Sequence, residues 1–351
     1  SQDNDDLKSL LDQLKGDPVH QERVLSLRRL MRHEHVTEDF VAHIIAKYPD
    51  VIEELFEDFS AISSPDSEHA PCINPKLHDL IAKVALNDED LTVLTIFLRF
   101  NASVLKTNFH KFPKSNISFR LSPSIIGELD LEVPFGLFFV MANDFQGFHI
   151  RFGDIARGGI RAIKSDTQVV YGRNKESQFM ENYNLAHTQM RKNKDIPEAG
   201  SKGTILLGPG LIMPKHVEYA FRKYVSGLLD LLLPHPQIVD HYGQTEILFL
   251  GPDENTADLM EWAALYAKRR GYQYWKAFTT GKPPSLGGVP HDTYGMTTRS
   301  VHKYVTEALA KNNLDESRVT KLQTGGPDGD LGSNEILISK DRTIAVVDVS
   351  E

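Results

Sequence analysis

Residues 148–205 read FHIRFGDIARGGIRAIKSDTQVVYGRNKESQFMENYNLAHTQMRKNKDIPEAGSKGTI and combine three kinds of local signal. Residues 148–152 alternate in side-chain character, which predicts a strand. Residues 156–161 (ARGGIR) predict a glycine turn. A helical pattern rich in Gln, Asn, Leu and Met follows, and it carries Gln189 and Lys192. We expect the rest of the chain to be organised around this stretch.

The stretch closes on residues 197–203 (PEAGSKG), which predict a tight loop with Lys202 next to a glycine. Glycine lets a ligand approach the backbone closely, and loops often carry function. If Lys202 is buried near other cations its pKa would fall, and it could act as a general base near neutral pH. The alternative is a solvated loop lysine. A phosphate-binding P-loop is excluded, because it requires Ser or Thr after the lysine and Gly203 follows here.

Charge is distributed unevenly along the chain. The 351 residues have a formal net charge of −9, whereas residues 151–202 contain ten Lys and Arg against six Asp and Glu, a local charge of +4. A basic segment in an acidic protein predicts a small anionic ligand rather than nucleic acid or a membrane surface. No run approaches the ~18 consecutive apolar residues of a membrane span.

The single cysteine, Cys72, lies in a Ser- and Pro-rich loop and cannot form an intrachain disulfide. We therefore expect a reducing compartment, the cytoplasm, with the mitochondrial matrix as the alternative. The chain begins SQDNDD, which is neither basic nor apolar, so no signal peptide is visible. It also lacks an initiator Met, and we expect a processed protein or a piece of a longer one.

The N-terminal part is helical in pattern. Apolar residues recur at helical spacing from Leu7 to Leu14 and from Val24 to Leu30, and Thr37 is placed to cap a further helix. More helical patterns, at 76–86 and 89–106, follow a linker at 63–75. No motif here carries chemistry, so a packing or assembly role is expected.

From residue 116 onward, strand and helix patterns alternate, which is typical of α/β proteins. Strands are predicted at 116–121, 134–143, 247–250, 319–323 and 343–347, with a turn at 144–147 and helices at 257–270 and 297–313.

A glycine-rich segment, residues 324–334 (TGGPDGDLGSN), follows one of these strands and precedes a short helical pattern. Such a turn lets backbone N–H groups and a helix N-terminus approach a pyrophosphate. Asp348 follows at the end of the next strand, where a carboxylate would bond a ribose 2′-hydroxyl and favour NAD over NADP. A purely structural glycine turn is the open alternative.

Asp253 lies just past the predicted strand at 247–250. Ligands of α/β proteins collect outside the carboxyl ends of strands, so Asp253 is a candidate site residue. It could instead cap the following helix, as could Asn255 or Thr256. His291-Asp292 lacks two further ligands at useful spacing, so no metal site is expected.

Taken together, these segments resemble the glutamate dehydrogenase family, and more closely its large NAD-dependent members of fungal and protist type. The resemblance covers about residues 116–351. The ordered matches are ARGGIR at 156–161, Gln189-x-x-Lys192, GSKG at 200–203, GPDENT at 251–256, KPPSLGG at 282–288 and TTR at 297–299. Arg157 stands where the common hexameric enzymes have Lys and the large enzymes have Arg. Residues 325–332 replace the family's usual Gly-Phe-Gly-Asn-Val-Gly turn.

The resemblance implies roles for the matched residues. Lys202 and Asp253 would be catalytic. Arg157 and Gly158 would bind the distal end of the substrate, and Gln189 and Lys192 would hold its α-carboxylate. The residues implied for NAD binding are Thr298, Gly326, Gly329, Asp330, Leu331, Gly332 and Asp348.

The implied reaction is the NAD-dependent oxidative deamination of L-glutamate to 2-oxoglutarate and ammonium. Lys202 would activate water as the general base, and Asp253 would shuttle protons. Two alternatives stay open. One is an amino-acid dehydrogenase for another substrate, against which the cation of Arg157 argues. The other is a non-catalytic nucleotide-binding or assembly subunit, which has no need of both Lys202 and Asp253.

The expected domain organisation has three parts. Residues 1–115 would be a helical N-terminal region, 116–296 an α/β substrate and catalytic domain, and 297–351 the incomplete start of a Rossmann-like NAD-binding domain. The resemblance further implies a homo-oligomer that acts on a small-molecule substrate.

Overall fold

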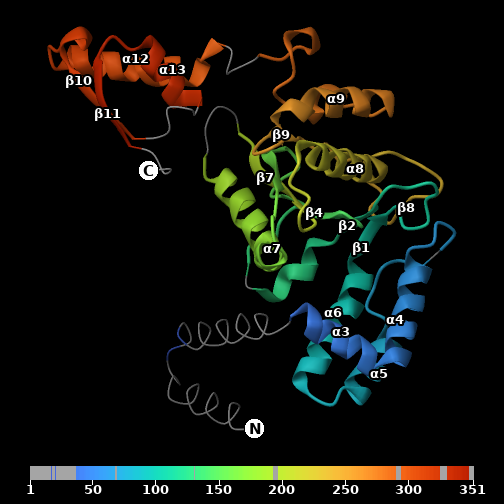
Figure 1. Ribbon diagram of the computed structural model, residues 1–351. Coiled ribbons are helices and arrows are strands. Elements are labelled where there is room, and N and C mark those ends of the chain that lie inside the picture. The colour runs from blue at the N-terminus through green and yellow to red at the C-terminus, as the bar shows by residue number, and fades with distance from the viewer. Residues whose placement is uncertain are drawn as a thin grey trace. The chain divides into compact units, whose positions relative to one another are not determined.

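The computed structural model (Figure 1) describes residues 17, 20, 37–67, 69–129, 131–192, 197–289, 294–324 and 330–347. The predicted helices at 7–14 and 24–30 lie outside these ranges. The chain divides into two compact units, Ser1–Thr279 and Thr280–Glu351. Within the described ranges, no helix is both long and apolar enough to cross a lipid bilayer.

Helices form the first described part of unit one. They are α3 (Glu38–Lys47), α4 (Pro49–Ile62), α5 (Pro75–Val84) and α6 (Asp88–Ser103). Each buries one apolar stripe in a shared core that includes Ile44, Leu55 and Leu94. The predicted cap is confirmed, since the Thr37 hydroxyl accepts a hydrogen bond from the Phe40 N–H at 3.3 Å. α5 begins at the end of the predicted linker.

The remainder of unit one is built on a mixed sheet, which confirms the α/β class. The strands are β1 (Val104–Thr107), β2 (Ile117–Leu121), β3 (Gly136–Ala142), β4 (Phe145–Arg151), β5 (Ala156–Arg157), β6 (Gly159–Ile163), β7 (Ala199–Leu207), β8 (Val239–Asp240) and β9 (Gly251–Pro252). Their order is β8-β1-β2-β3-β4-β7-β6-β9, and β5 also pairs with β7. β4 is antiparallel to β7, whereas β5 and β6 are parallel to β7 and β9 is parallel to β6.

Helices cover both faces of this sheet (Figure 1). α7 (Gln168–Met190) lies on one face and α8 (Pro214–Leu232) on the other. Strand alternation explains the division, because Phe138 and Val140 pack with the α8 core while Leu137 and Ile150 pack with Ala186 of α7. The 3-10 helices η1 (Pro123–Leu129) and η2 (Ala257–Leu259) and the helices α9 (Met260–Arg269) and α10 (Trp275–Phe278) complete the unit.

Several predicted elements are confirmed and others are wrong. The strands at 116–121 and 134–143 and the helix at 257–270 are present, with small boundary shifts. The turn expected at 144–147 is shorter, because β4 already begins at Phe145. The helix expected over 89–106 ends at Ser103, since Val104 and Thr107 pair with β2 as part of β1. β-Branched side chains favour that extended conformation.

The strand expected at 247–250 does not join the ladder, apart from one bridge between Leu250 and Thr279. Side chains take the place of a neighbouring strand here. The Arg151 guanidinium donates to the Ile247 carbonyl at 2.6 Å, and the Leu248 N–H donates to the Tyr272 hydroxyl at 3.3 Å. The backbone groups are therefore satisfied without strand pairing.

The loop expected at 197–203 is also wrong, because residues 199–207 form β7, which pairs with β4 on one side and with β5 and β6 on the other. The glycines of β7 are required by close contacts with neighbouring elements and not by a turn. A Cβ on Gly200 would lie 2.1 Å from the Ala186 carbonyl oxygen of α7, and one on Gly203 would lie 2.3 Å from Ile160 Cδ1. Neither glycine adopts a left-handed backbone.

Unit two contains a βαβ arrangement. Its elements are η3 (Pro284–Leu286), α12 (Met296–Lys311), η4 (Glu316–Arg318), β10 (Thr320–Thr324), α13 (Asp330–Ile338) and β11 (Arg342–Val347). β10 and β11 are parallel, and α13 lies between them in the chain. The predicted helix at 297–313 and strands at 319–323 and 343–347 are confirmed.

Candidate active site

Lys202 and Asp253, 51 residues apart, form an ion pair between the Lys202 Nζ and the Asp253 Oδ2. Lys202 lies on β7, and Asp253 directly follows β9. β6 runs between these two strands, and it begins with Gly159. A Cβ on Gly159 would lie 2.8 Å from the Asp253 carboxylate, so the missing side chain leaves room for the pair. The side chains are 13% and 30% exposed, which leaves the pair open on one side.

The loop after β9 fixes the Asp253 carboxylate. Oδ1 accepts a hydrogen bond from the Glu254 N–H at 2.7 Å, while Oδ2 contacts Lys202. The Asp253 N–H donates to the Thr256 hydroxyl at 3.1 Å, and that hydroxyl donates to the Ile160 carbonyl at 2.6 Å. Of the two roles open from the sequence, the carboxylate thus takes a position beside Lys202 rather than at the start of a helix.

The pKa of Asp253 is lowered below its ordinary value. Burial raises it, but the hydrogen bond from Lys202, the Glu254 N–H and the charges of Lys202 and Arg161 together outweigh burial. Asp253 is therefore ionised at neutral pH, where it can accept a proton.

Arg157 and Gly158 lie where β5 and β6 approach β7. Arg157 is the register partner of Gly200, and its Nε contacts the Glu198 Oε1 at 2.6 Å. Gly158 permits this approach, because a Cβ there would lie 1.5 Å from the Ser201 carbonyl oxygen. The Gly158 carbonyl also accepts a hydrogen bond from the Gly251 N–H at 2.8 Å. Gly158 thus links the strands that carry Lys202 and lead to Asp253.

The end of α7 brings Gln189 to the same place. A Cβ built on Gly200 would lie 2.9 Å from the Gln189 Cβ, so Gln189 borders β7 at the level of Gly200. Lys192 lies in the exposed turn after α7, and its N–H donates to the Gln189 carbonyl at 3.3 Å. The structure therefore places Arg157 and Gln189 at Gly200, two residues before Lys202, whereas Lys192 lies in an exposed turn.

The residues expected at the cofactor lie in unit two. Thr298 is buried on α12 and donates from its hydroxyl to the Leu331 carbonyl at 3.3 Å, so the starts of α12 and α13 are in contact. α13 begins at Asp330, and Leu331 and Gly332 form its first turn. Gly326, Gly329 and Asp348 lie outside the described residues. The described residues contain no group of three or more His, Cys, Asp or Glu that could hold a metal ion.

Sequence reasoning missed two sets of site neighbours. Glu198 pairs with Arg157, and Arg161 contacts Glu254 at 2.8 Å and Glu181 of α7 at 2.5 Å. A strand assignment for residues 199–207 would have put position 198 on the same face as Lys202. The glycines obscured that signal.

A second charged cluster lies at the sheet, and no sequence pattern predicts it. We call it the arginine cluster, and it consists of Arg120, Arg151 and Glu246. Arg120 Nη2 lies 3.1 Å from the Glu246 Oε1, and Arg151 Nη2 lies 3.9 Å from the same oxygen. All three side chains are at most 2% exposed. Burial is the main cause that lowers the pKa of Arg151, against the raising effect of Glu246.

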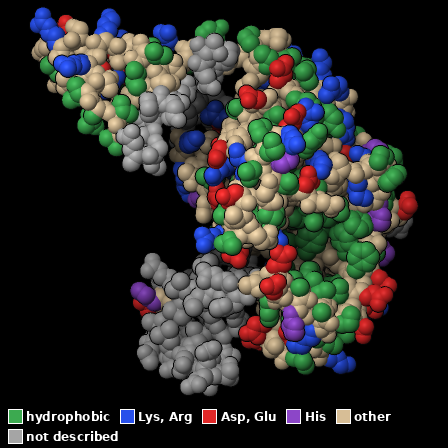
Figure 2. Space-filling view, in the orientation of Figure 1, with side chains coloured by type: hydrophobic (Ala, Val, Ile, Leu, Met, Phe, Trp, Pro, Cys, Tyr) green, Lys and Arg blue, Asp and Glu red, His purple; other side chains and the backbone are tan. Residues whose placement is uncertain are grey.

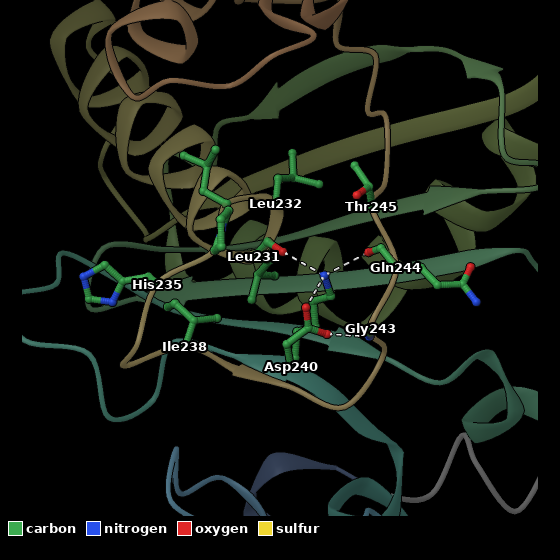
Figure 3. Close-up of a pocket in the computed structure, with 11 residues that line it drawn as sticks. Leu231, Leu232, His235, Ile238, Asp240, Gly243, Gln244 and Thr245 are labelled. Atoms are coloured by element: carbon green, nitrogen blue, oxygen red, sulfur yellow. Dashed lines mark hydrogen bonds and ion pairs between the residues drawn. The ribbon is translucent and has the colours of Figure 1, made fainter.

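A cavity of about 350 Å³ lies at the other edge of the sheet (Figure 3). Buried Lys106 of β1 contacts the Leu231 carbonyl at 3.4 Å, the Gln244 carbonyl at 3.2 Å and the Asp240 carboxylate at 2.9 Å. The sheet order puts β8 beside this cavity and β9 at the opposite edge. The cavity is thus separate from Lys202 and Asp253.

On the face drawn in Figure 2, acidic and basic side chains are intermingled over unit one. Residues 151–202 contain a local excess of +4. Several cations of this segment are engaged with carboxylates, as Arg157, Arg161 and Lys202 are.

A part-buried lysine–aspartate pair and an arginine on the same sheet of an α/β protein are groups that proton transfer on an anionic substrate would use. Residues 76–349 match the family described as bacterial NAD-glutamate dehydrogenase, catalytic domain. The chain belongs to this family, and the resemblance found from the sequence motifs is confirmed.

Relatives named glutamate dehydrogenase match most of the chain. The chain is 49% identical over 344 residues to glutamate dehydrogenase 2 of Dictyostelium discoideum. That alignment covers 95% of this chain and 32% of the relative. The chain is 47% identical over 350 residues to the NAD-specific glutamate dehydrogenase of Neurospora crassa. This second alignment covers 94% of this chain and 33% of the relative. The chain thus spans about a third of the length of these curated relatives.

Solved glutamate dehydrogenase structures are also similar. A hetero-hexameric glutamate dehydrogenase from Thermus thermophilus, in a leucine-bound form, aligns with a TM-score of 0.36 and 24% identity. The alignment covers 68% of this chain and 50% of that chain.

Proposed function

We propose that the protein to which this chain belongs catalyses the NAD-dependent oxidative deamination of L-glutamate to 2-oxoglutarate and ammonium. The observation that carries the proposal is the pairing of Lys202 with Asp253 in a part-buried position beside Arg157 and Gln189. The names of the relatives, at 44–49% identity, support the same reaction.

In the proposed reaction each side chain has a distinct role. Arg157 holds the distal carboxylate, and Gln189 with Lys192 holds the α-carboxylate, so the Cα is fixed between them. Asp253, which is ionised at neutral pH, accepts a proton from the substrate ammonium. Asp253 releases that proton to solvent and then accepts one from the Lys202 ammonium. The neutral Lys202 amine then takes a proton from the water that attacks the imine. The ion pair gives the two residues a direct route for exchanging that proton.

NAD, when bound, supplies the hydride acceptor. The unit-two elements fit a dinucleotide, because α13 starts within the glycine-rich segment 324–334 and lies between two parallel strands in the chain. Backbone N–H groups at such a helix start bind a pyrophosphate. In this proposal Thr298, Asp330, Leu331 and Gly332 hold the cofactor, together with Gly326, Gly329 and Asp348.

The wider organisation is part of the proposal. Residues 1–115 would form the helical N-terminal region, 116–296 the catalytic domain and 297–351 the start of a Rossmann-like domain. The packed helices α3–α6 and the βαβ arrangement of unit two support the first and third parts, although β1 belongs to the sheet and unit two begins at Thr280. The protein would be a homo-oligomer in the cytoplasm, which light scattering and fractionation can test.

The decisive experiment is to follow NADH production by the intact protein with glutamate, leucine and phenylalanine in parallel. We expect turnover with glutamate to exceed that with either apolar amino acid by at least tenfold, because Arg157 offers a cation to the distal carboxylate. Faster oxidation of leucine or phenylalanine would assign another substrate, and no NADH with any of the three would contradict a dehydrogenase.

A further inference from the structure

The face of β7 toward α7 carries a second ion pair. Glu198 directly precedes β7, and its carboxylate lies 2.6 Å from the Arg157 Nε. Glu198 is 12% exposed and Arg157 is 33% exposed, so the carboxylate is the deeper partner. Arg157 is the residue that the proposed function assigns to the distal carboxylate of the substrate. The site therefore already contains a carboxylate at this guanidinium.

Strand geometry places Glu198 among the site residues. Alternate positions of a strand point to the same face, so 198, 200 and 202 form one row. Gly200 lies in the middle of the row, under the end of α7, and Arg157 is its register partner on β5. The row thus runs from the Glu198–Arg157 pair, past a position without a side chain, to the Lys202–Asp253 pair.

We propose that Glu198 is a specificity-determining residue that weakens the binding of a carboxylate at Arg157. The proposal rests on the proposed function. A ligand carboxylate that reaches Arg157 from solvent meets the guanidinium with a second carboxylate already beside it. Like charges at close range repel, and in a part-buried site water screens that repulsion only partly.

The consequence is that a ligand needs a second binding contact in addition to Arg157. Because Glu198 offsets the charge of Arg157, a distal carboxylate alone gives weak binding. A ligand must also place its α-carboxylate at Gln189 and Lys192 to be held. Glu198 would in this way select amino acids with two carboxylates over small acids with one.

The test is Glu198→Gln in the intact protein, which keeps size and hydrogen bonding but removes the charge. Glutarate is the probe, because it carries two carboxylates and no amino group to oxidise. Calorimetry should show glutarate binding about tenfold more tightly than in the wild type, and its monoamide glutaramate, whose single carboxylate can also reach Arg157, should tighten by a similar factor. The KM for glutamate should fall by a similar factor, and kcat should change less than KM.

Two further variants make the result specific. Glu218→Gln makes the same change in an Arg–Glu pair on α8, on the other face of the sheet, and should leave glutarate affinity as in the wild type. Glu198→Asp keeps the charge and should stay within threefold of the wild type. Circular dichroism and thermal melting of all three variants show whether they are folded.

Weaker or unchanged glutarate binding in folded Glu198→Gln would overturn the proposal and make Glu198 a residue that orients Arg157. Absence of glutarate binding to both the wild type and Glu198→Gln would overturn it as well. The proposed function fails by a different observation, which is the absence of NADH formation from glutamate by the wild type. If glutarate still binds and tightens in that case, a carboxylate-binding role for Arg157 survives without the reaction.

Discussion

The Lys202–Asp253 pair and the arginine cluster lie in the same sheet but differ in their access to water. The three charged side chains of the arginine cluster are at most 2% exposed. Its arginines also donate to main-chain carbonyls, Arg120 to Leu121 at 2.7 Å and Arg151 to Ile247 at 2.6 Å. The Lys202–Asp253 pair is part-exposed and contains one charge of each sign.

This difference separates two uses of buried charge. A closed cluster with several fixed acceptors resists change, because removing one member leaves an uncompensated charge in a medium that solvates it poorly. An open pair can exchange its partner for a ligand or pass a proton, since water and substrate can reach it. Charge in a protein interior thus indicates a site only when it remains accessible from one side.

The largest expected effect is on the open pair. Lys202→Ala in the intact protein should lower kcat for glutamate oxidation by about 10²–10⁴-fold, because a general base is lost. NAD binding should stay within a few-fold, and the protein should remain folded. The control is Lys223→Ala, which removes a half-buried lysine of α8 that pairs with Asp144. Normal glutamate oxidation by Lys202→Ala would refute the mechanism.

A substitution in the arginine cluster should change the stability of the fold rather than the activity. Glu246→Gln removes the buried carboxylate shared by Arg120 and Arg151, and Arg151 keeps only the exposed Asp154, at 3.3 Å. The free energy of unfolding should fall by about 3–5 kcal/mol. Urea denaturation measures this loss, with Glu218→Gln as the exposed control. A loss below about 1 kcal/mol would mean that the main-chain carbonyls of Leu121 and Ile247, with Asp154, satisfy the two guanidinium groups.

Arg157→Leu tests whether the arginine beside the open pair belongs to the site. Loss of a hydrogen bond to a charged group costs about 1.5–3 kcal/mol, so the KM for glutamate should rise on the order of 10–100-fold. Steady-state kinetics measure it, and the melting temperature should change little by comparison. An unchanged KM would refute the distal-carboxylate role and would leave Arg157 as a structural partner of Glu198.

The smallest effect concerns the pH dependence of the open pair. The pKa of Asp253 is lowered in the folded state, so its charge stabilises the fold above the unfolded-state pKa of about 3.9. That contribution is lost as pH falls through the lower folded-state pKa. The difference in unfolding free energy between wild type and Asp253→Asn should therefore be constant from pH 7 to about 5 and then shrink toward pH 2. A difference that grows on acidification would contradict the lowered pKa.

Much of the scaffold was predictable from local pattern. β2 and β3 have the apolar runs or alternation of buried strands, and α12 has a helical period. Asp253 does follow a strand, but that strand is β9 and not the predicted 247–250. The motif matches unite Lys202 and Asp253 in one hypothesis. Their contact now gives that hypothesis a physical basis.

What escaped prediction depends on long-range contacts. β7 contains Gly200, Ser201 and Gly203, which are signals of a loop, and only the nearness of α7 and Ile160 explains glycine in a strand. The arginine cluster joins residues far apart in sequence, and nothing local marks Glu246 as their partner. Glu198 was not predicted as a site residue, because its position follows from the strand β7, and Gly200 and Gly203 made that segment resemble a loop.

Gly200 in β7 and Gly158 beside it also limit what random mutagenesis can reveal about the site. At Gly158 and Gly200 an added Cβ would fall 1.5 and 2.1 Å from a neighbouring carbonyl oxygen, so any substitution displaces main chain. A library scored by growth on glutamate would rank these positions as intolerant as Lys202, for an unrelated reason. Scoring the same library for the yield of folded protein would separate them, because Lys202 variants would survive that selection and the glycine variants would not.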